Sequence, residues 1–467
     1  MTLDYADIQG TILRGYRVDH ARHLVLRIHD RVGAKGFLGA LVDPGRGLPQ
    51  ITTAARWNTK PRSFLNLGIT AAGLAALGQP LDGFPDAFTR GATDPATAIL
   101  VGDVGPSAPS AWVDGFADGA SVHLILSLWV DRDLDELERV AAILRKAFSG
   151  SLDELAAQDA TALPENKVHF GYTDNISQPT VDGAPPTKRP RPDQQPVAPT
   201  GEFLLGYPSQ NQGGVYRVTP APLSTNSSFA AFRLLEQDVG AFEAWLATAA
   251  AQTGGDVELL AAKVCGRWRT GVPLVLSPDT GTPDPPLAPE RINDYGYVSG
   301  DDRFGYRCPV GAHMRRTNPR DEAVVAGGSA HRIIRRAMPY GPPYDPAKDD
   351  GPRGLVGWFI NADIANQFEL IMSQWVNGSA FVKSDPDACP PGTPGRQCAN
   401  PLWNITGNDV VLGANDPATS SFTLSYPGTS AARWRNETLT GFTSFVTTRG
   451  GAYCYLPSIT ALRYITS

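Results

Sequence analysis

The sequence predicts an α+β fold, built from two halves in which strands and helices alternate. Apolar side chains alternate with other residues over 21–30, which is typical of a β-strand. After Asp133 they recur at helical spacing instead. A proline-rich stretch at 184–200 then separates two parts of similar pattern. We therefore expect an N-terminal module at 1–183, a stiff linker at 184–200 and a C-terminal module at 201–467.

In the first half, further strands are predicted at 64–70 and 121–130, where apolar and β-branched residues are dense. A short helix is predicted at 71–77, because Gly78 follows it directly. A longer helix begins after Asp133, whose carboxylate is available as an N-cap, and carries an apolar stripe as far as Phe148.

In the second half, strands are predicted at 202–207, 355–360 and 445–455. Helices are predicted at 239–250 and 362–376. The latter is strongly amphipathic, with one stripe formed by Ile364, Phe368, Ile371, Met372 and Trp375.

Composition describes an ordinary globular chain. Of 467 residues, 42% are hydrophobic and 19% are charged, and the net charge of −6 argues against a nucleic-acid partner. No apolar run approaches the roughly 18 residues that span a bilayer, so no membrane association is expected. The first residues show neither a basic nor an apolar leader segment, which predicts a cytoplasmic protein. The residues leave monomer and homodimer open.

The five cysteines form no Cys-x-x-Cys pair, so neither a disulfide framework nor a zinc site is indicated. Cys389 and Cys398 flank a Pro/Gly loop and are the one candidate pair. In a reducing compartment we expect free thiols instead.

The stretch 308–342 gathers several guanidinium groups around one imidazole. Such clusters commonly serve an anion or an electron-rich cofactor. The competing interpretation is a solvated basic surface with an incidental histidine. The residues in question are His313, Arg315, Arg316, Arg320, Arg335 and Arg336.

Two motifs favour the cofactor. His313 with Asn318-Pro319-Arg320, followed by Arg335 and Pro339-Tyr340-Gly341-Pro342, resembles the haem-ligand stretch of the dye-decolourising peroxidases. The segment His169–Pro179, which contains Asp174, resembles that family's Gly-x-x-Asp-Gly signature. The resemblance implies two ferredoxin-like modules with packed antiparallel sheets, similar to a dimeric α+β barrel. It places the haem in the C-terminal module and the distal Asp segment in the N-terminal one.

The resemblance also implies roles for single residues. His313 would be the axial ligand of the iron in haem b, and Arg320 would bind a haem propionate. Asp174 would be the distal acid/base and Arg335 the distal cation that stabilises negative charge as the O–O bond breaks. The competing interpretations are a turn or helix-cap carboxylate for Asp174 and a surface salt bridge for Arg335.

The segment 407–413 resembles the family's Gly-x-Asp-Pro-x-x-Gly stretch, which supplies the carboxylate partner of the axial histidine. Asp409 is the candidate, although Val410 replaces the proline and an ordinary turn Asp is the alternative. Leu355 matches an apolar residue that contacts the haem on its distal side.

Two positions depart from the family pattern. Asn175 replaces a glycine, and because Asn tolerates a positive φ we expect the backbone turn to be kept. Gly357 replaces a large distal side chain beside Leu355, and we expect the distal pocket to be wider there. Tyr340 and Trp375 match surface radical sites of some relatives, but core packing is the safer interpretation for both.

The function predicted is a haem peroxidase that reduces hydrogen peroxide and oxidises dyes, phenols or other aromatic donors by one-electron steps. The alternative is a haem-binding protein for storage, sensing or delivery, which needs His313 and Arg320 but not the distal pair. A hydrolase or dehydrogenase is disfavoured, because no Gly-x-Gly-x-x-Gly, Walker, Gly-x-Ser-x-Gly or His-Glu-x-x-His motif is present.

Overall fold

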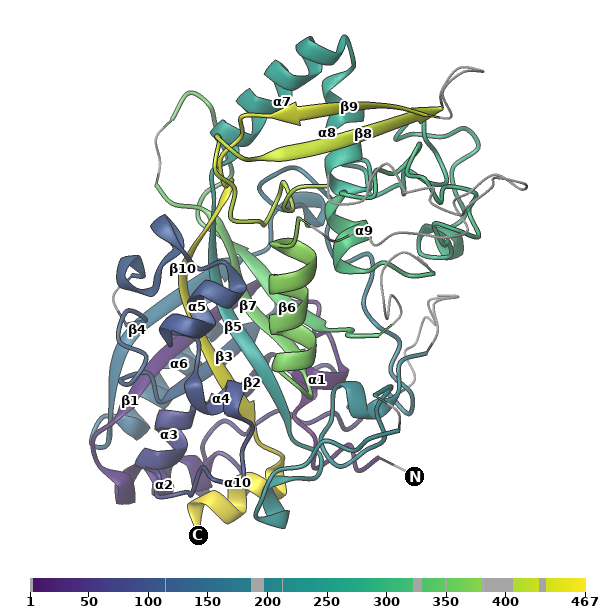
Figure 1. The fold of residues 1–467 in the computed structure, drawn as a ribbon. Coiled ribbons are helices and arrows are strands. Elements are labelled where there is room, and N and C mark those ends of the chain that lie inside the picture. The colour runs from purple at the N-terminus through teal and green to yellow at the C-terminus, as the bar shows by residue number, and fades with distance from the viewer. Residues whose placement is uncertain are drawn as a thin grey trace.

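An eight-stranded antiparallel sheet is the centre of the fold (Figure 1). The structure is a computed structural model that describes residues 3–113, 115–185, 197–211, 213–321, 330–348, 351–379, 381, 406–427 and 434–467. The first half contributes β1 (His20–Ile28), β2 (Ser63–Ile69), β3 (Leu124–Val130) and β4 (Leu152–Thr161). The second half contributes β5 (Ser228–Gln237), β6 (Ile334–Tyr340), β7 (Gly354–Asn361) and β10 (Val446–Leu456).

The strand order shows that the two halves are built alike. The sheet runs β4-β1-β3-β2-β10-β5-β7-β6. In each half the four strands, counted along the chain, lie side by side in the order fourth, first, third, second. This is the ferredoxin-like order. The halves join where Tyr455 of β10 pairs with Ile69 of β2. The edge strands β4 and β6 also contact each other, so the sheet curls toward a barrel. The predicted α+β fold of two ferredoxin-like modules is confirmed.

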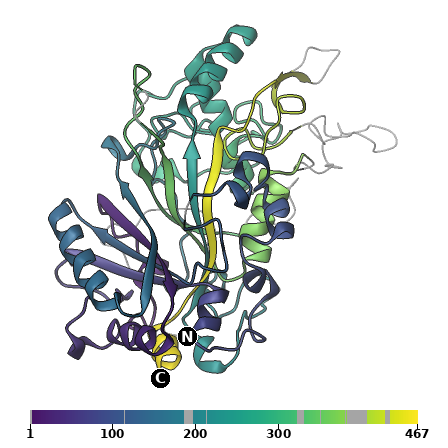
Figure 2. The same ribbon diagram turned by 90° about the vertical axis from the view of Figure 1, so that its left-hand side faces the viewer.

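Helices surround the sheet, and most begin at a capping side chain. In α6 (Leu134–Phe148) the Asp133 carboxylate accepts a hydrogen bond from the amide of Glu136 at 3.0 Å, and an apolar stripe is buried, as predicted. Helices α7 and α8 lie beside the hairpin β8–β9 at one end of the molecule, and both termini lie at the other (Figures 1 and 2). The bounds are α1 Gly10–Leu13, α2 Arg31–Ala40, α3 Ala71–Ala76, α4 Asp86–Arg90, α5 Pro95–Val101, α7 Val239–Thr253, α8 Val257–Cys265, α9 His313–Thr317 and α10 Ile459–Thr466, with π-helices η8 Ala365–Glu369 and η9 Ile371–Val376 and strands β8 Ser421–Pro427 and β9 Trp434–Thr440.

The strand predicted at 202–207 is wrong. This segment forms a 3-10 turn at Thr200–Glu202 followed by further turns. Leu204 and Leu205 are buried as strand residues would be, but the chain reverses at Gly206, whose φ is +90°. The strand of this region is β5, which sequence analysis missed. Nearly every residue of β5 is buried, so it lacks the polar alternation of a half-exposed strand.

Most of the predicted linker and the whole of the candidate cysteine pair lie outside the described residues. Within 184–200, residues 186–196 lie outside the described residues, so the division into modules at this stretch stays a prediction. Cys389 and Cys398 also lie outside them. Among the helices that the structure does describe, none combines the length and hydropathy needed to cross a membrane.

A buried set of hydrogen-bonded side chains connects the two halves within the core. His23 on β1 is fully buried, and its Nδ1 lies 2.7 Å from Oγ of Ser127 on β3. The indole N–H of Trp358 on β7 donates to the same hydroxyl at 2.9 Å. Burial lowers the pKa of His23 to about 3, against a weak opposing effect of Asp159. The imidazole is therefore neutral in the folded protein at every ordinary pH.

His23 should make the folded protein sensitive to acid well above pH 4. Once unfolded, the imidazole binds a proton below its usual pKa of about 6.5, whereas the folded protein does not, so stability falls as pH decreases below that value. We expect this residue to account for a loss of about 2 kcal/mol between pH 6.5 and pH 5. In urea unfolding at several pH values, His23→Gln should show a flatter pH dependence. The control His20→Gln, at the half-buried first position of β1, should keep the steep one, and parallel curves for wild type and His23→Gln would contradict the assignment.

Candidate functional site

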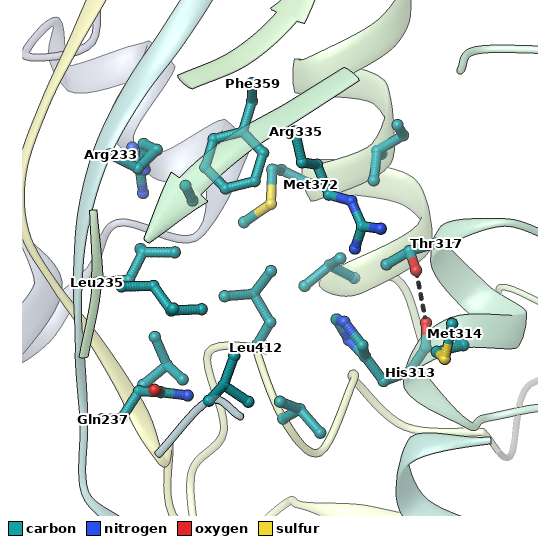
Figure 3. A pocket seen from close by; sticks show the side chains of 18 of the residues that line it. Arg233, Leu235, Gln237, His313, Met314, Thr317, Arg335, Phe359, Met372 and Leu412 are labelled. Carbon is teal, nitrogen blue, oxygen red and sulfur yellow. Dashed lines mark hydrogen bonds between the residues drawn. The ribbon is translucent and has the colours of Figure 1, made fainter. Parts of the chain in front are cut away.

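A cavity of about 410 Å³ opens between the second half of the sheet and the segments that face it. Leu235 and Gln237 of β5, Arg335 of β6 and Leu355 of β7 project from the sheet side. Across from them lies His313 on α9 (Figure 3). Further walls come from η9, the loop after Asp409 and the predicted Asp174 segment. The structure thus gathers four of the eight predicted site residues at one cavity, namely Asp174, His313, Arg335 and Leu355.

His313 is held from behind by a buried carboxylate. Its Nδ1 lies 2.9 Å from Oδ2 of Asp409, a residue with no exposed surface. The other oxygen of Asp409 accepts the backbone amides of Val411 and Leu412, at 2.8 and 2.9 Å. A carboxylate fixed in this way requires a proton on Nδ1, so Nε2 is the ring nitrogen left for the cavity.

Opposing effects act on the pKa of Asp409. Burial alone would raise this pKa, but the charge and hydrogen bond of His313, together with the Arg316 guanidinium, lower it below its usual value. Asp409 is therefore an ionised acceptor. This is the proximal pairing that the resemblance implies, although the valine at 410 departs from the family pattern.

Arg315 and Arg316 are not surface residues, contrary to one interpretation of the basic stretch. Both are 0% exposed. Arg315 donates to the main-chain oxygen of Cys308 at 2.6 Å and pairs with Asp302 at 3.3 Å. Arg316 donates to the main-chain oxygens of Trp375 and Gly407. Both guanidinium groups fasten α9 to its surroundings and do not line the cavity.

The Asp174 segment is bound to the strand that carries Arg335. The side-chain amide of Gln178 accepts from the backbone N–H of Arg335 and donates to its carbonyl, both at 3.1 Å. Nη2 of Arg335 donates to the carbonyl of Ser177 at 2.8 Å. Asp174 and Arg335 both line the cavity, so two motifs 161 positions apart in number meet at one site. Asn175 adopts φ +61°, which confirms that it keeps the left-handed turn predicted for this position.

Arg320 is placed differently from the other candidates. It is not among the described residues that line the cavity. Its Nη1 donates to the carbonyls of Asn293 and Tyr295, and its guanidinium lies 3.7 Å from the centre of the Tyr295 ring. Arg267 does line the cavity and donates to the Asn293 side chain at 2.8 Å. Its Nε is buried with no hydrogen-bond partner among the described residues. Sequence analysis missed Arg267, since no motif marks it.

Tyr340 and Trp375 are both buried, at 7% and 4% exposure. The Trp375 ring packs edge-on against His331, with ring centres 5.7 Å apart. The main-chain oxygen of Tyr340 accepts from His169 at 2.8 Å. These contacts favour the core-packing interpretation over direct encounter of a bulky donor with either ring.

Comparison with known proteins gives the fold and the site a family. No family model matches the chain. Peroxidase 2 of Mycetinis scorodonius is 30% identical over 99% of this chain and 87% of that protein. A dye-decolorizing peroxidase of Mycena epipterygia is 29% identical over the same shares of the two chains. The chain belongs to the dye-decolourising peroxidase family. It is accordingly a hydrogen-peroxide-dependent oxidoreductase.

Solved structures agree with this membership in the dye-decolourising peroxidases. A fungal enzyme of the type from Auricularia auricula-judae superposes with a TM-score of 0.79 at 26% identity, and each chain is covered completely. A dye-decolorizing peroxidase in complex with 2,6-dimethoxyphenol gives a TM-score of 0.79 at 29% identity, again over the whole of both chains.

The expectation that Gly357 widens the pocket of this peroxidase stays a prediction. Gly357 does not line the cavity, whereas Phe359, two positions further on the same face of β7, does (Figure 3). At Gly357 φ is +155°, and a Cβ there would lie 2.1 Å from the carbonyl oxygen of Arg336 and 2.5 Å from Cα of Ala337. Glycine is required by the close approach of β6. Sequence analysis missed Phe359 because it lies outside the family motifs.

Gly357→Ala should therefore destabilise this dye-decolourising peroxidase without touching the cavity directly. The new methyl group would push β6 outward and strain the backbone, for an expected loss of about 3 kcal/mol in unfolding free energy. Urea unfolding would measure the loss. As a control, Gly36→Ala changes an exposed glycine of α2 that has open space around it, and a small gain in stability is expected. Wild-type stability of Gly357→Ala would contradict the role of the close approach.

Proposed function

We propose that this dye-decolourising peroxidase uses haem b at the described cavity to reduce hydrogen peroxide and to oxidise dyes, phenols or other aromatic donors by one-electron steps. The observation that carries the proposal is the Nδ1 hydrogen bond of His313 to the buried Asp409, which leaves Nε2 for a metal. The relative whose structure includes 2,6-dimethoxyphenol supports a phenolic donor.

The residues of the cavity fit a haem. His313 supplies an imidazole nitrogen, and the wall beside it is apolar, with Leu355, Met372 and Leu412. The orphaned Nε of Arg267 is a buried donor that a haem propionate would satisfy. Arg320 would support that carboxylate from behind, through the Asn293 that it shares with Arg267. When bound, haem supplies the iron chemistry by which a peroxide bond is cleaved and donors are oxidised.

The distal residues of this chain handle protons and charge. Asp174 takes a proton from one oxygen of the peroxide and returns it to the other, which then leaves as water. Arg335, held by Ser177, stabilises the negative charge that develops on the departing oxygen. On the other side, Asp409 keeps the proton of His313 on Nδ1. The lone pair of Nε2 is then free for a metal, and the carboxylate makes Nε2 a stronger electron-pair donor.

Several finer expectations accompany this proposal. Leu355 excludes water from the distal side, and Tyr340 and Trp375 stay candidate radical sites whose burial argues for core roles. The cytoplasmic location, the choice between monomer and homodimer, and the module boundary at 184–200 stay predictions.

The proposal is tested by the ultraviolet-visible spectrum of the haem-reconstituted protein before and after one equivalent of hydrogen peroxide. Wild type should show a Soret band that changes with peroxide, and His313→Ala should lose or strongly alter that band. Asp174→Asn should keep the resting band but react about 10²–10⁴-fold more slowly. The controls His29→Ala and Asp86→Asn change exposed residues away from the cavity and should behave as wild type.

Two results would contradict the proposal. A Soret band that peroxide leaves unchanged would favour a haem carrier for storage, sensing or delivery. Failure to form any Soret band after reconstitution would exclude the haem assignment itself.

A further inference from the structure

Gln237 presents an unsatisfied amide to the cavity. It is the last residue of β5 and is 6% exposed. Its backbone N–H donates to the carbonyl of Arg353, but its side chain makes no hydrogen bond with any described residue, and Oε1 is buried. Figure 3 shows the side chain reaching into the cavity on the opposite side from Arg335, with Leu412 between it and His313. Burying an amide oxygen without a hydrogen-bond partner is unfavourable, so such a group indicates a ligand.

Asn415 adds a second unsatisfied amide to the same cavity. Its Nδ2 donates to the carbonyl oxygens of Asp409 and Gly413, while Oδ1 is buried with no partner among the described residues. Ser444 links this loop to β10, because its hydroxyl accepts from the backbone N–H of Asn415 at 2.8 Å. Two residues further, Val446 of β10 pairs with Gln237 in the sheet. The two amides thus belong to one end of the cavity.

The polarity of this end decides which ligand fits. The lining residues near the two amides are uncharged, namely Leu412, Thr443, Ser444 and Val446. A haem carries only two polar substituents, both carboxylates, and these are better matched by Arg267 at the Asp174 segment. An amide both donates and accepts, so a neutral hydroxyl group satisfies it without an uncompensated charge.

We propose that Gln237 and Asn415 form a subsite that binds the hydroxyl group of a small neutral phenol. The hydroxyl donates to an amide oxygen and accepts from the Gln237 amide N–H, and the aromatic ring lies against Leu235 and Leu412. The inference rests on the proposed function, since it assigns to the peroxidase the part of its cavity that recognises an aromatic donor. Gln237 is thereby a positioning residue that selects phenols over their ethers.

The test measures dissociation constants by calorimetry on the haem-loaded protein without peroxide. The probes are 2,6-dimethoxyphenol and its methyl ether 1,2,3-trimethoxybenzene, which lacks the hydroxyl donor. Gln237→Leu should weaken phenol binding about 3–10-fold, the effect of one hydrogen bond, and leave ether binding unchanged. The control Gln158→Leu, a half-buried glutamine of the edge strand β4 that does not line the cavity, should bind both as wild type does.

Three outcomes would overturn the inference. Equal weakening of phenol and ether would mean that the substitution changes only shape. Unchanged phenol binding would mean that the amides bind water alone, and loss of the Soret band in Gln237→Leu would make Gln237 a haem contact. Failure of the proposed function gives a different result. The wild type would then lack a Soret band, or its band would not change with peroxide, and both are measured before any phenol is added.

Discussion

The buried guanidinium of Arg316 holds together the segments on which the site depends. It reaches from α9 to the carbonyl of Trp375 on η9 and to that of Gly407 before the Asp409 loop. Burial lowers its pKa to about 10, against the opposing charge of Asp409. Its Nη1 and Nη2 donate to these carbonyls, whereas Nε has no partner among the described residues. Because a buried guanidinium that loses its acceptors is strongly destabilised, these three segments have little freedom to move apart.

This constraint explains how a very short helix can hold His313, the proposed axial ligand, in place. Helix α9 has five residues, too few for a helix to be stable by itself. Arg315 ties this helix to Asp302 and Arg316 ties it to η9, while His313, its first residue, lines the cavity. Its position is set by buried arginines and by Asp409 more than by helical propensity. Arg315 and Arg316, which looked like part of a binding surface in the sequence, therefore support His313.

Features that depend on one residue or a short segment could be predicted from the sequence. Features that depend on contacts with distant segments could not. The turn at Asn175 could be predicted because an allowed φ is a property of one residue. The pairing of His313 with Asp409 could be predicted only through resemblance, since 96 positions separate them. The burial of Arg316 depends on carbonyls from distant loops, and the need for glycine at 357 depends on the backbone of β6. Neither leaves a local signal, and β5 lacks one because both of its faces are buried.

The parts of the cavity differ in which polar side-chain groups lack a partner. Arg233 lines the cavity, but its guanidinium is paired with the buried Asp103 and with Thr448, so it offers little free charge to a ligand. Near the Asp174 segment, Arg267 keeps an unsatisfied donor, whereas at Gln237 the unsatisfied groups are neutral amides. Because an anion gains most where a cation is unmatched, and a hydroxyl gains most at an amide, ligand carboxylates should bind near Arg267 and ligand hydroxyls near Gln237. The protein's own side chains would thereby set the orientation of a bound ligand.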